Sequence, residues 1–227
     1  VLIAQIPVAL VLAEPDLGTA LVIELIVMVM IFVAGLRMRT ILLFGLAALP
    51  VFYHFVISTP FRLRRILGYI DPWSYRSSVG YQITEALIAI GSGGVTGGGL
   101  GEGKKRLFFL PEAHTDFIFA ILAEELGLIG VCVLLLLFCV VAWRGVCIAL
   151  NSNNSFDGYL AIGLTGLIAI PALFNVAVAT GLLPTKGLPL PFISSGGSNL
   201  VTGLLAIGLL MRIYRDGKAF GGEKVAP

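Results

Sequence analysis

Long apolar runs alternate with short polar stretches along most of the chain, which is the pattern of helices that cross a membrane several times. A bilayer core of roughly 30 Å requires about 20 helical residues. Six runs come near that length, and they cover residues 1–13, 18–36, 41–57, 116–143, 159–181 and 200–213. We expect the first run to be truncated and the last to be short. The pattern predicts an all-α polytopic membrane protein with about six transmembrane helices in this sequence.

The composition agrees with a membrane protein. Hydrophobic residues make up 58% of the chain and charged residues 12%, with a mean hydropathy of +1.00, whereas about a quarter of a soluble domain is charged. The net charge of +2 is too small, and the basic residues are too clustered, to indicate nucleic-acid binding. The three cysteines have no metal-ligand spacing, which favours a packing role. Because the chain opens inside an apolar run, without Met or a basic segment, we expect the C-terminal part of a longer protein.

The distribution of lysine and arginine predicts the orientation in the membrane. Basic residues follow or end the second, fourth and last runs, with Arg37, Arg144, Arg212 and Arg215 among them. Strict alternation places the ends of these three runs and the C-terminus on one side, which is then the cytoplasm. Residues 58–115 form a large extracytoplasmic loop. Among its cations are Arg62, Arg64, Arg65, Lys104, Lys105 and Arg106. An anionic ligand and contact with lipid headgroups are both open explanations for them.

A compact polar group stands directly at the start of the fourth apolar run. It contains Glu112, His114 and Asp116. Ionisable residues at the mouth of a membrane helix are costly, which indicates a function. At 100° per residue, Asp116 shares a helix face with Ala120 and Ala123, so it would point into a helix bundle. From spacing alone, a helix cap is an equal alternative for Asp116.

The large loop has a pattern of its own. Asp71 begins a turn with an interfacial Trp73, and the spacing of apolar residues predicts a helix over 81–90, in or on the membrane. Residues 91–103 are too rich in glycine for a stable helix and suit a backbone that approaches a ligand closely. Residues 98–104 nearly match a phosphate-binding loop, but Lys105 replaces the Ser or Thr that would hold magnesium and no strand precedes it.

Other polar residues in or near the apolar runs are weaker candidates. Asp16 fits an N-cap of the second helix. Glu24 lies within the second run and is a functional candidate by its position, although the sequence shows no partner for it. Asn175 is a further polar outlier. Lys186 lies in a loop rich in proline and glycine before the last run, which fits a re-entrant or cavity-lining backbone.

Several of these segments resemble, in the same order, the motifs of one family. They are EPDLGTA at residues 14–20, GYQ at 80–82, LPEAHTDFIFA at 110–120, EELG at 124–127, GLLPTKG at 181–187, PFIS at 191–194 and GGS at 196–198. Together they resemble the SEDS family (shape, elongation, division and sporulation), and the variants AH and TKG within them favour its division branch, FtsW. Ser195, Asn199 and the pair Thr84-Glu85 depart from the family pattern, which bears on packing or substrate fit.

The resemblance implies a fold and an activity. Residues 1–227 would be a single SEDS membrane domain, the C-terminal part of a fold of about ten helices. The activity would be that of a peptidoglycan glycosyltransferase in the bacterial inner membrane, which polymerises lipid II for septal wall synthesis by inverting transfer, with undecaprenyl diphosphate as the leaving group. The active site would lie on the extracytoplasmic side. Without the N-terminal helices, the chain alone should not be active.

The resemblance also assigns roles to residues. An alcohol nucleophile needs a base, and a diphosphate leaving group needs cations. Asp116 matches the family's essential aspartate and is the predicted base, which His114 and Glu112 would orient. The other predicted substrate-binding residues are Lys104, Lys105, Arg106, Lys186, Arg62, Arg65, Ser194 and Ser198. No cofactor is implied with certainty, and a divalent cation on the diphosphate, Mg²⁺ or Mn²⁺, is left open.

The expected partners are lipid II, a class B penicillin-binding protein that acts as transpeptidase, and other division proteins, all at the membrane and without nucleic acid. Two other functions stay open. A lipid II flippase would suit Glu24 and the outer basic loop, and a scaffold would only recruit the transpeptidase. Replacement of Asp116 separates the three, because only a polymerase should bind lipid II and then fail to join it.

Overall fold

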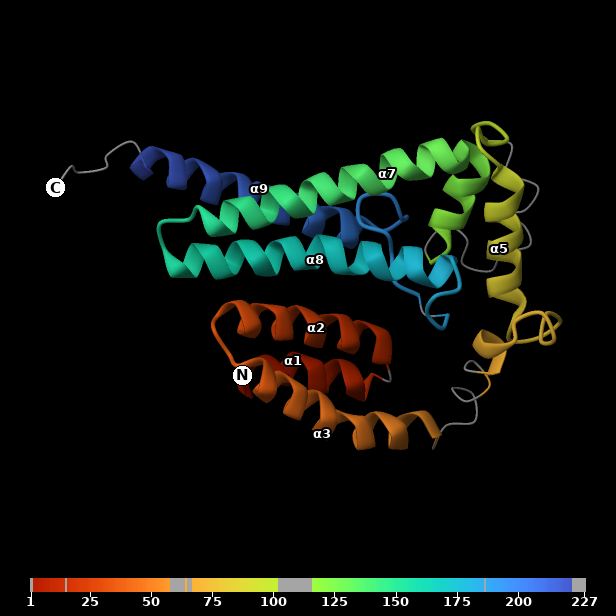
Figure 1. The fold of residues 1–227 in the computed structure, drawn as a ribbon, viewed down its shortest axis with the longest axis horizontal. Coiled ribbons are helices and arrows are strands. Elements are labelled where there is room, and N and C mark those ends of the chain that lie inside the picture. The colour runs from red at the N-terminus through yellow and green to blue at the C-terminus, as the bar shows by residue number, and fades with distance from the viewer. Residues whose placement is uncertain are drawn as a thin grey trace. The chain divides into compact units, whose positions relative to one another are not determined.

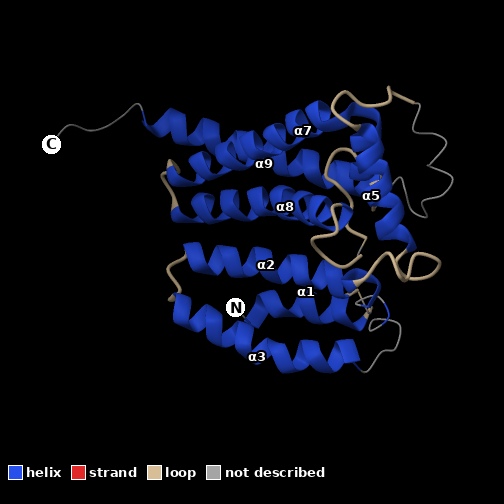
Figure 2. Cartoon of the chain, turned by 45° about the vertical axis from the view of Figure 1, so that its right-hand side comes forward, coloured by secondary structure: helices blue, strands red, loops and turns tan. Residues whose placement is uncertain are grey.

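The structure, a computed structural model, describes residues 2–14, 16–57, 64, 67–101, 116–185 and 187–221. Regular structure in these ranges is helical, and none of them contains a strand (Figures 1 and 2). In chain order the helices are α1 (Leu2–Ala13), α2 (Leu17–Val33), α3 (Met38–Ile57), α5 (Tyr81–Gly93), α7 (Ile118–Leu150), α8 (Ser155–Ala179) and α9 (Gly197–Gly221). The predicted all-α class is confirmed, as is a helix where spacing predicted one over 81–90.

Three of the described helices are long and apolar enough to cross a membrane, namely α7, α8 and α9 as far as Gly217. Helix α2 is apolar but shorter. The total of about six spans therefore stays a prediction. Only 6% of the most apolar window of α7 is buried, so most of its apolar side chains lie on the surface, as expected of a helix that contacts lipid or further membrane helices.

Two helices extend beyond one end of the apolar runs that indicated them. Helix α7 continues past Arg144 to Leu150, and α8 begins at Ser155. Hydropathy marks the part of a helix that suits the bilayer, whereas backbone hydrogen bonding continues into the neighbouring polar residues. An apolar run therefore does not give the full length of its helix.

The chain divides into two compact units. The first consists of Val1–Arg37, Leu136–Pro171 and Gly196–Pro227, and the second of Met38–Leu135 and Ala172–Ser195. Two of the boundaries, those at Leu135/Leu136 and Pro171/Ala172, fall inside helices, so α7 and α8 each contribute to both units.

In the first unit, α1 and α2 contact each other. Asp16 caps α2 as predicted, because its carboxylate accepts hydrogen bonds from the Thr19 N–H (3.1 Å) and hydroxyl (2.8 Å). The second half of α7, the first part of α8 and α9 share an apolar cluster around Ala161, Leu210 and Ile213.

In the second unit, the start of α7 packs against α5 and the end of α8. The buried members of this cluster are Ala86, Ala89, Phe117, Ala120, Ile121 and Val178. Ala120 and Ala123 are both buried, so the predicted small-residue face of α7 does turn inward. Small side chains there allow neighbouring backbones to approach closely.

Helix α7 is broken at Gly127, whose φ of 65° and ψ of −167° are not helical. The loop after α5 supplies hydrogen-bond partners for the backbone groups at this break. Four backbone hydrogen bonds join the two segments: Gly98 N–H to Glu124 C=O (2.9 Å), Gly99 N–H to Glu125 C=O (3.1 Å), Leu128 N–H to Gly94 C=O (3.0 Å) and Ile129 N–H to Val95 C=O (3.2 Å). We predicted that the glycine-rich stretch would approach a ligand closely, and its described part instead approaches helix α7.

Candidate active site

Asp116 stands immediately before α7, and the structure holds it there through its neighbour. Phe117 is 2% exposed and belongs to the cluster between α5, α7 and α8. Burial of this ring fixes the start of α7, so the half-buried Asp116 is carried to a defined place at the helix mouth. Its backbone carbonyl accepts a hydrogen bond from Asn175 Nδ2 of α8 (2.9 Å).

The carboxylate of Asp116 lies against the loop that follows α8. A Cβ placed on Gly187 would collide with Oδ2 of this carboxylate and stand 2.7 Å from Oδ1. Glycine is therefore the residue that lets the loop pass so close to the acid. The structure thus brings together two segments that the sequence separates, the start of α7 and the proline-rich loop after α8.

Asp116 stands two residues before the first residue of α7, and the helix-cap alternative for its side chain stays a prediction. Helix α7 begins at Ile118, and the N–H groups of Ala120 and Ile121 donate to the carbonyl of Phe117 (3.0 and 3.4 Å). Phe117 therefore occupies the cap position, and Asp116 precedes it by one residue.

Ser194 closes a tight turn in the loop after α8. Its hydroxyl accepts a hydrogen bond from the Leu190 N–H (2.7 Å), and its own N–H donates to the Leu190 carbonyl (3.0 Å). Phe192, at the middle of this turn, has a φ of 66°, a backbone conformation that is rare outside glycine. The Ser194 side chain is 7% exposed, so it stabilises the loop, and its predicted contact with substrate stays a prediction.

Ser198 lies in the first turn of α9, which belongs to the first unit. Its side chain is exposed and its carbonyl accepts a hydrogen bond from the Thr202 hydroxyl (2.7 Å). The remaining predicted site residues lie outside the described residues: Arg62, Arg65, Lys104, Lys105, Arg106, Glu112, His114 and Lys186. Within the described part of the chain, no group of three or more His, Cys, Asp or Glu residues could hold a metal ion.

Two polar residues inside helices have partners that the sequence did not reveal. Asn175, 1% exposed, donates from Nδ2 to the carbonyl of Leu188 (2.7 Å) as well as to that of Asp116. Glu24 accepts a hydrogen bond from Gln5 Nε2 of α1 (3.0 Å), so the view that it lacks a partner in this chain was wrong. In both cases the only signal was a polar residue within an apolar helix.

The turn at Asp71 is also present. The Ser74 N–H donates to the carboxylate (3.2 Å), and hydrogen bonds from the Ser74 side chain and backbone lower the pKa of Asp71. Trp73 beside it is 56% exposed, as an interfacial aromatic would be.

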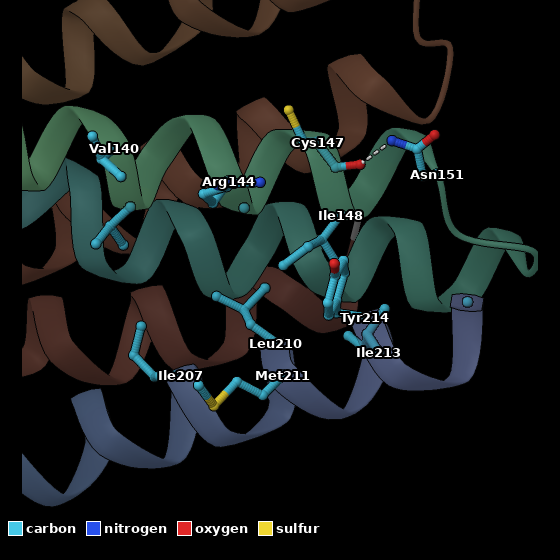
Figure 3. Close-up of a pocket in the computed structure, with 13 residues that line it drawn as sticks. Val140, Arg144, Cys147, Ile148, Asn151, Ile207, Leu210, Met211, Ile213 and Tyr214 are labelled. Atoms are coloured by element: carbon cyan, nitrogen blue, oxygen red, sulfur yellow. Dashed lines mark hydrogen bonds between the residues drawn. The ribbon is translucent and has the colours of Figure 1, made fainter. Parts of the chain in front are cut away.

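A separate cavity of about 660 Å³ lies in the first unit, between the second half of α7 and α9 (Figure 3). Its lining is mainly apolar, with Ile148, Leu210 and Met211 among its residues, and its polar members include Arg144 on α7 and Asn151 directly after α7. None of the predicted site residues lines it.

The sequence matches the family described as "Cell cycle protein", that of FtsW, RodA and SpoVE, over residues 1–219. It is 50% identical over 202 residues to the probable peptidoglycan glycosyltransferase FtsW of Geobacter sulfurreducens, covering 89% of this chain and 54% of the relative. It is 45% identical over 206 residues to the stage V sporulation protein E of Bacillus subtilis, covering 91% of this chain and 56% of the relative. The chain therefore spans about half the length of the curated relatives it matches.

Solved structures of similar fold agree with this match. One is a chain from a study of "structural coordination of polymerization and crosslinking by a peptidoglycan synthase complex", with a TM-score of 0.76, 33% identity, and coverage of 95% of this chain and 60% of that one. Another is the rod shape determining protein RodA of Thermus thermophilus, with a TM-score of 0.62, 33% identity, and coverage of 95% and 55%.

Proposed function

Because this chain belongs to the family of cell cycle proteins FtsW, RodA and SpoVE, we propose that the protein containing it is a peptidoglycan glycosyltransferase that joins lipid II into glycan strands during septal wall synthesis. The observation that carries the proposal is the Asp116 carboxylate, which lies at the start of a membrane helix and against the loop after α8. The relatives named as probable peptidoglycan glycosyltransferases support it.

In this reaction Asp116 is the general base. The 4-hydroxyl of a GlcNAc on one lipid-linked disaccharide attacks the anomeric carbon of the MurNAc at the end of the growing chain, with inversion. A C–O bond forms there, the bond from that carbon to the diphosphate oxygen breaks, and undecaprenyl diphosphate leaves with the electron pair. The hydroxyl proton passes to Asp116, a carboxylate that must lie within hydrogen-bond reach of the acceptor sugar.

The leaving group carries the negative charge that develops, so the site needs cations. The candidates are Lys104, Lys105, Arg106, Lys186, Arg62 and Arg65. His114 and Glu112 would orient Asp116, and Ser194 and Ser198 are further candidates for substrate contact. The described residues contain no group of three or more His, Cys, Asp or Glu side chains that could hold a metal ion, so a divalent cation, Mg²⁺ or Mn²⁺, would be held mainly by the diphosphate.

The protein is a multi-pass membrane protein, as its three long apolar helices and its family indicate. We place the C-terminus in the cytoplasm and the active site on the extracytoplasmic side, where the donor and acceptor sugars lie. A class B penicillin-binding protein that cross-links the new strands is the proposed partner, alongside other division proteins. A similar chain studied in a peptidoglycan synthase complex supports this choice.

The proposal is tested with the full-length protein, purified with its transpeptidase partner and supplied with lipid II. Wild type should produce glycan chains on a gel. Asp116→Asn keeps the size of the side chain but removes the base, so polymerisation should fall by about 10²- to 10⁴-fold. Lipid II binding and partner binding should persist in the variant, since neither requires proton transfer.

Transport of lipid II is the second candidate, and the hydrogen-bonded carboxylate of Glu24 within α2 favours it. If Asp116→Asn polymerises as well as wild type, the polymerase assignment is wrong. Loss of lipid II movement across vesicles in Glu24→Gln would then support the transporter. If cells that carry Asp116→Asn grow and recruit the partner normally although the variant does not polymerise lipid II, the scaffold function is supported.

A further inference from the structure

Asn175 is the most buried polar side chain near Asp116. It lies in the last turns of α8, is 1% exposed, and uses its side-chain amide to reach two other segments. Nδ2 donates to the carbonyl oxygen of Asp116 (2.9 Å) and to that of Leu188 (2.7 Å). One side chain therefore joins three parts of the second unit: the end of α8, the residue before α7, and the loop that follows α8.

Both carbonyls lie outside the helical hydrogen bonds. The N–H groups of Ala120 and Ile121 donate to Phe117 C=O, so the ladder of α7 begins one residue after Asp116. Leu188 lies in the loop after α8, in a part without regular structure. A buried carbonyl that is hydrogen-bonded avoids the cost of an unpaired polar group, so the Asn175 amide stabilises both positions.

The two acceptors also fix which way the amide points. A flipped side chain would set Oδ1 against two carbonyl oxygens, which repel it, so the NH₂ group must face them. Oδ1 is buried and accepts no hydrogen bond from the residues that the structure describes. The requirement at position 175 is thus for a side chain with two N–H donors, and aspartate or leucine of similar size supplies none.

The amide acts on both sides of the contact between Asp116 and Gly187. One acceptor is the backbone of Asp116 itself, and the other, Leu188, directly follows Gly187, which touches the Asp116 carboxylate. We propose that Asn175 is a positioning residue that holds the Asp116 carboxylate at a fixed place against the Gly187 backbone. The inference rests on the proposed function, in which Asp116 is the base.

The test compares Asn175→Ser, which keeps one donor on a shorter side chain, and Asn175→Asp, which keeps the size but removes both donors. Thr180→Val is the matched control, because Thr180 directly follows the same helix and its hydroxyl bonds, among the described residues, only to carbonyls of α8. In full-length protein with its partner and lipid II, kcat of the Asn175 variants should fall by about 10- to 100-fold. KM for lipid II should change much less, since the base does not bind the lipid.

A second readout needs no activity. Cysteine is placed at position 116, in a background whose native cysteines are replaced by alanine, and its alkylation by a small water-soluble maleimide is timed. The Asn175→Ser background should speed labelling severalfold, because the segment before α7 is no longer tied to the loop. Thr180→Val should leave the rate unchanged.

The outcomes separate this inference from the proposed function. If Asp116→Asn abolishes polymerisation while the Asn175 variants keep wild-type kcat and labelling rate, the positioning role is wrong and the function stands. If kcat falls only in proportion to the folded fraction, with unchanged labelling, Asn175 is merely structural. If Asp116→Asn polymerises normally, the function itself fails, and the labelling rates alone still show whether Asn175 holds this segment.

Discussion

Asp116 and Gly187 limit each other, because the carboxylate of the first occupies the space that a side chain at the second would need. The contact has no counterpart in local sequence, since it joins the start of α7 to the loop after α8. Because Gly187 has no side chain, the Asp116 carboxylate can lie close to the backbone of the loop. This contact restricts where the carboxylate oxygens lie, as a base that must accept a proton from one hydroxyl group of a sugar requires.

We expect Gly187→Ala to reduce polymerisation by about 10- to 100-fold, because the added methyl displaces the carboxylate from its place. The measurement is glycan-chain synthesis from lipid II by the full-length protein. Gly91→Ala is the control, since a Cβ at Gly91 in α5 meets no atom within 4 Å. Equal activity of both variants would show that the carboxylate does not need its present position.

Some of this site could be predicted and some could not. The place of Asp116 at a helix mouth follows from the pattern of polar and apolar residues, and its role from the family resemblance. The residues that hold it do not follow, because Asn175 is 59 positions away in the sequence and reaches a backbone carbonyl that any residue type provides. Gln5, the partner of Glu24, could not be predicted for a similar reason. The periodicity of α1 and of α2 does not show which residues of the two helices contact each other.

Helix α7 shows how an element can be interrupted within an apolar run. At Gly127 the regular backbone hydrogen bonds of the helix are interrupted, and the loop after α5 supplies two donors and two acceptors to the groups on either side. In an apolar environment unpaired backbone groups are costly, so a broken membrane helix needs such a partner. The presence of a glycine could not reveal the break, because Gly130 and Gly145 lie in the same helix and keep its helical backbone.

Gly127→Ala should destabilise the protein by about 1–3 kcal/mol, because a φ of 65° with a ψ of −167° belongs to the region reserved for glycine. A Cβ there would also stand 2.7 Å from the Val95 carbonyl oxygen. Thermal unfolding of the detergent-solubilised protein measures the loss. Gly208→Ala in α9 should not lower the melting temperature, since no atom lies within 4 Å of a Cβ at Gly208. A melting temperature of Gly127→Ala equal to that of wild type would mean that the break is not required.

At the scale of the whole molecule, charge and helix direction give the same topology. If α7, α8 and α9 cross the membrane in succession, the ends of α7 and α9 share one side. Arg144 near the end of α7 and Arg212 in α9 would both belong to that side, which the positive-inside rule predicts to be cytoplasmic. The hydrogen bond from Asn153 Nδ2 to the Gly217 carbonyl (3.5 Å) joins the connection between α7 and α8 to the end of α9, as this arrangement requires.

Cysteine labelling in intact cells tests this topology through two exposed positions at opposite ends of α8. Asn153 is exposed in the connection before α8, and Leu182, 70% exposed, lies in the loop after it. In a background without native cysteines, Leu182→Cys should react with a membrane-impermeant maleimide added outside, and Asn153→Cys should react only after the membrane is permeabilised. Because the proposed donor and acceptor sugars lie outside, the Asp116 carboxylate must share the side of Leu182. Labelling of Asn153→Cys in intact cells would mean that the chain has the opposite orientation. The proposed base would then lie on the side without substrate, so the measurement tests the proposed chemistry as well as the topology.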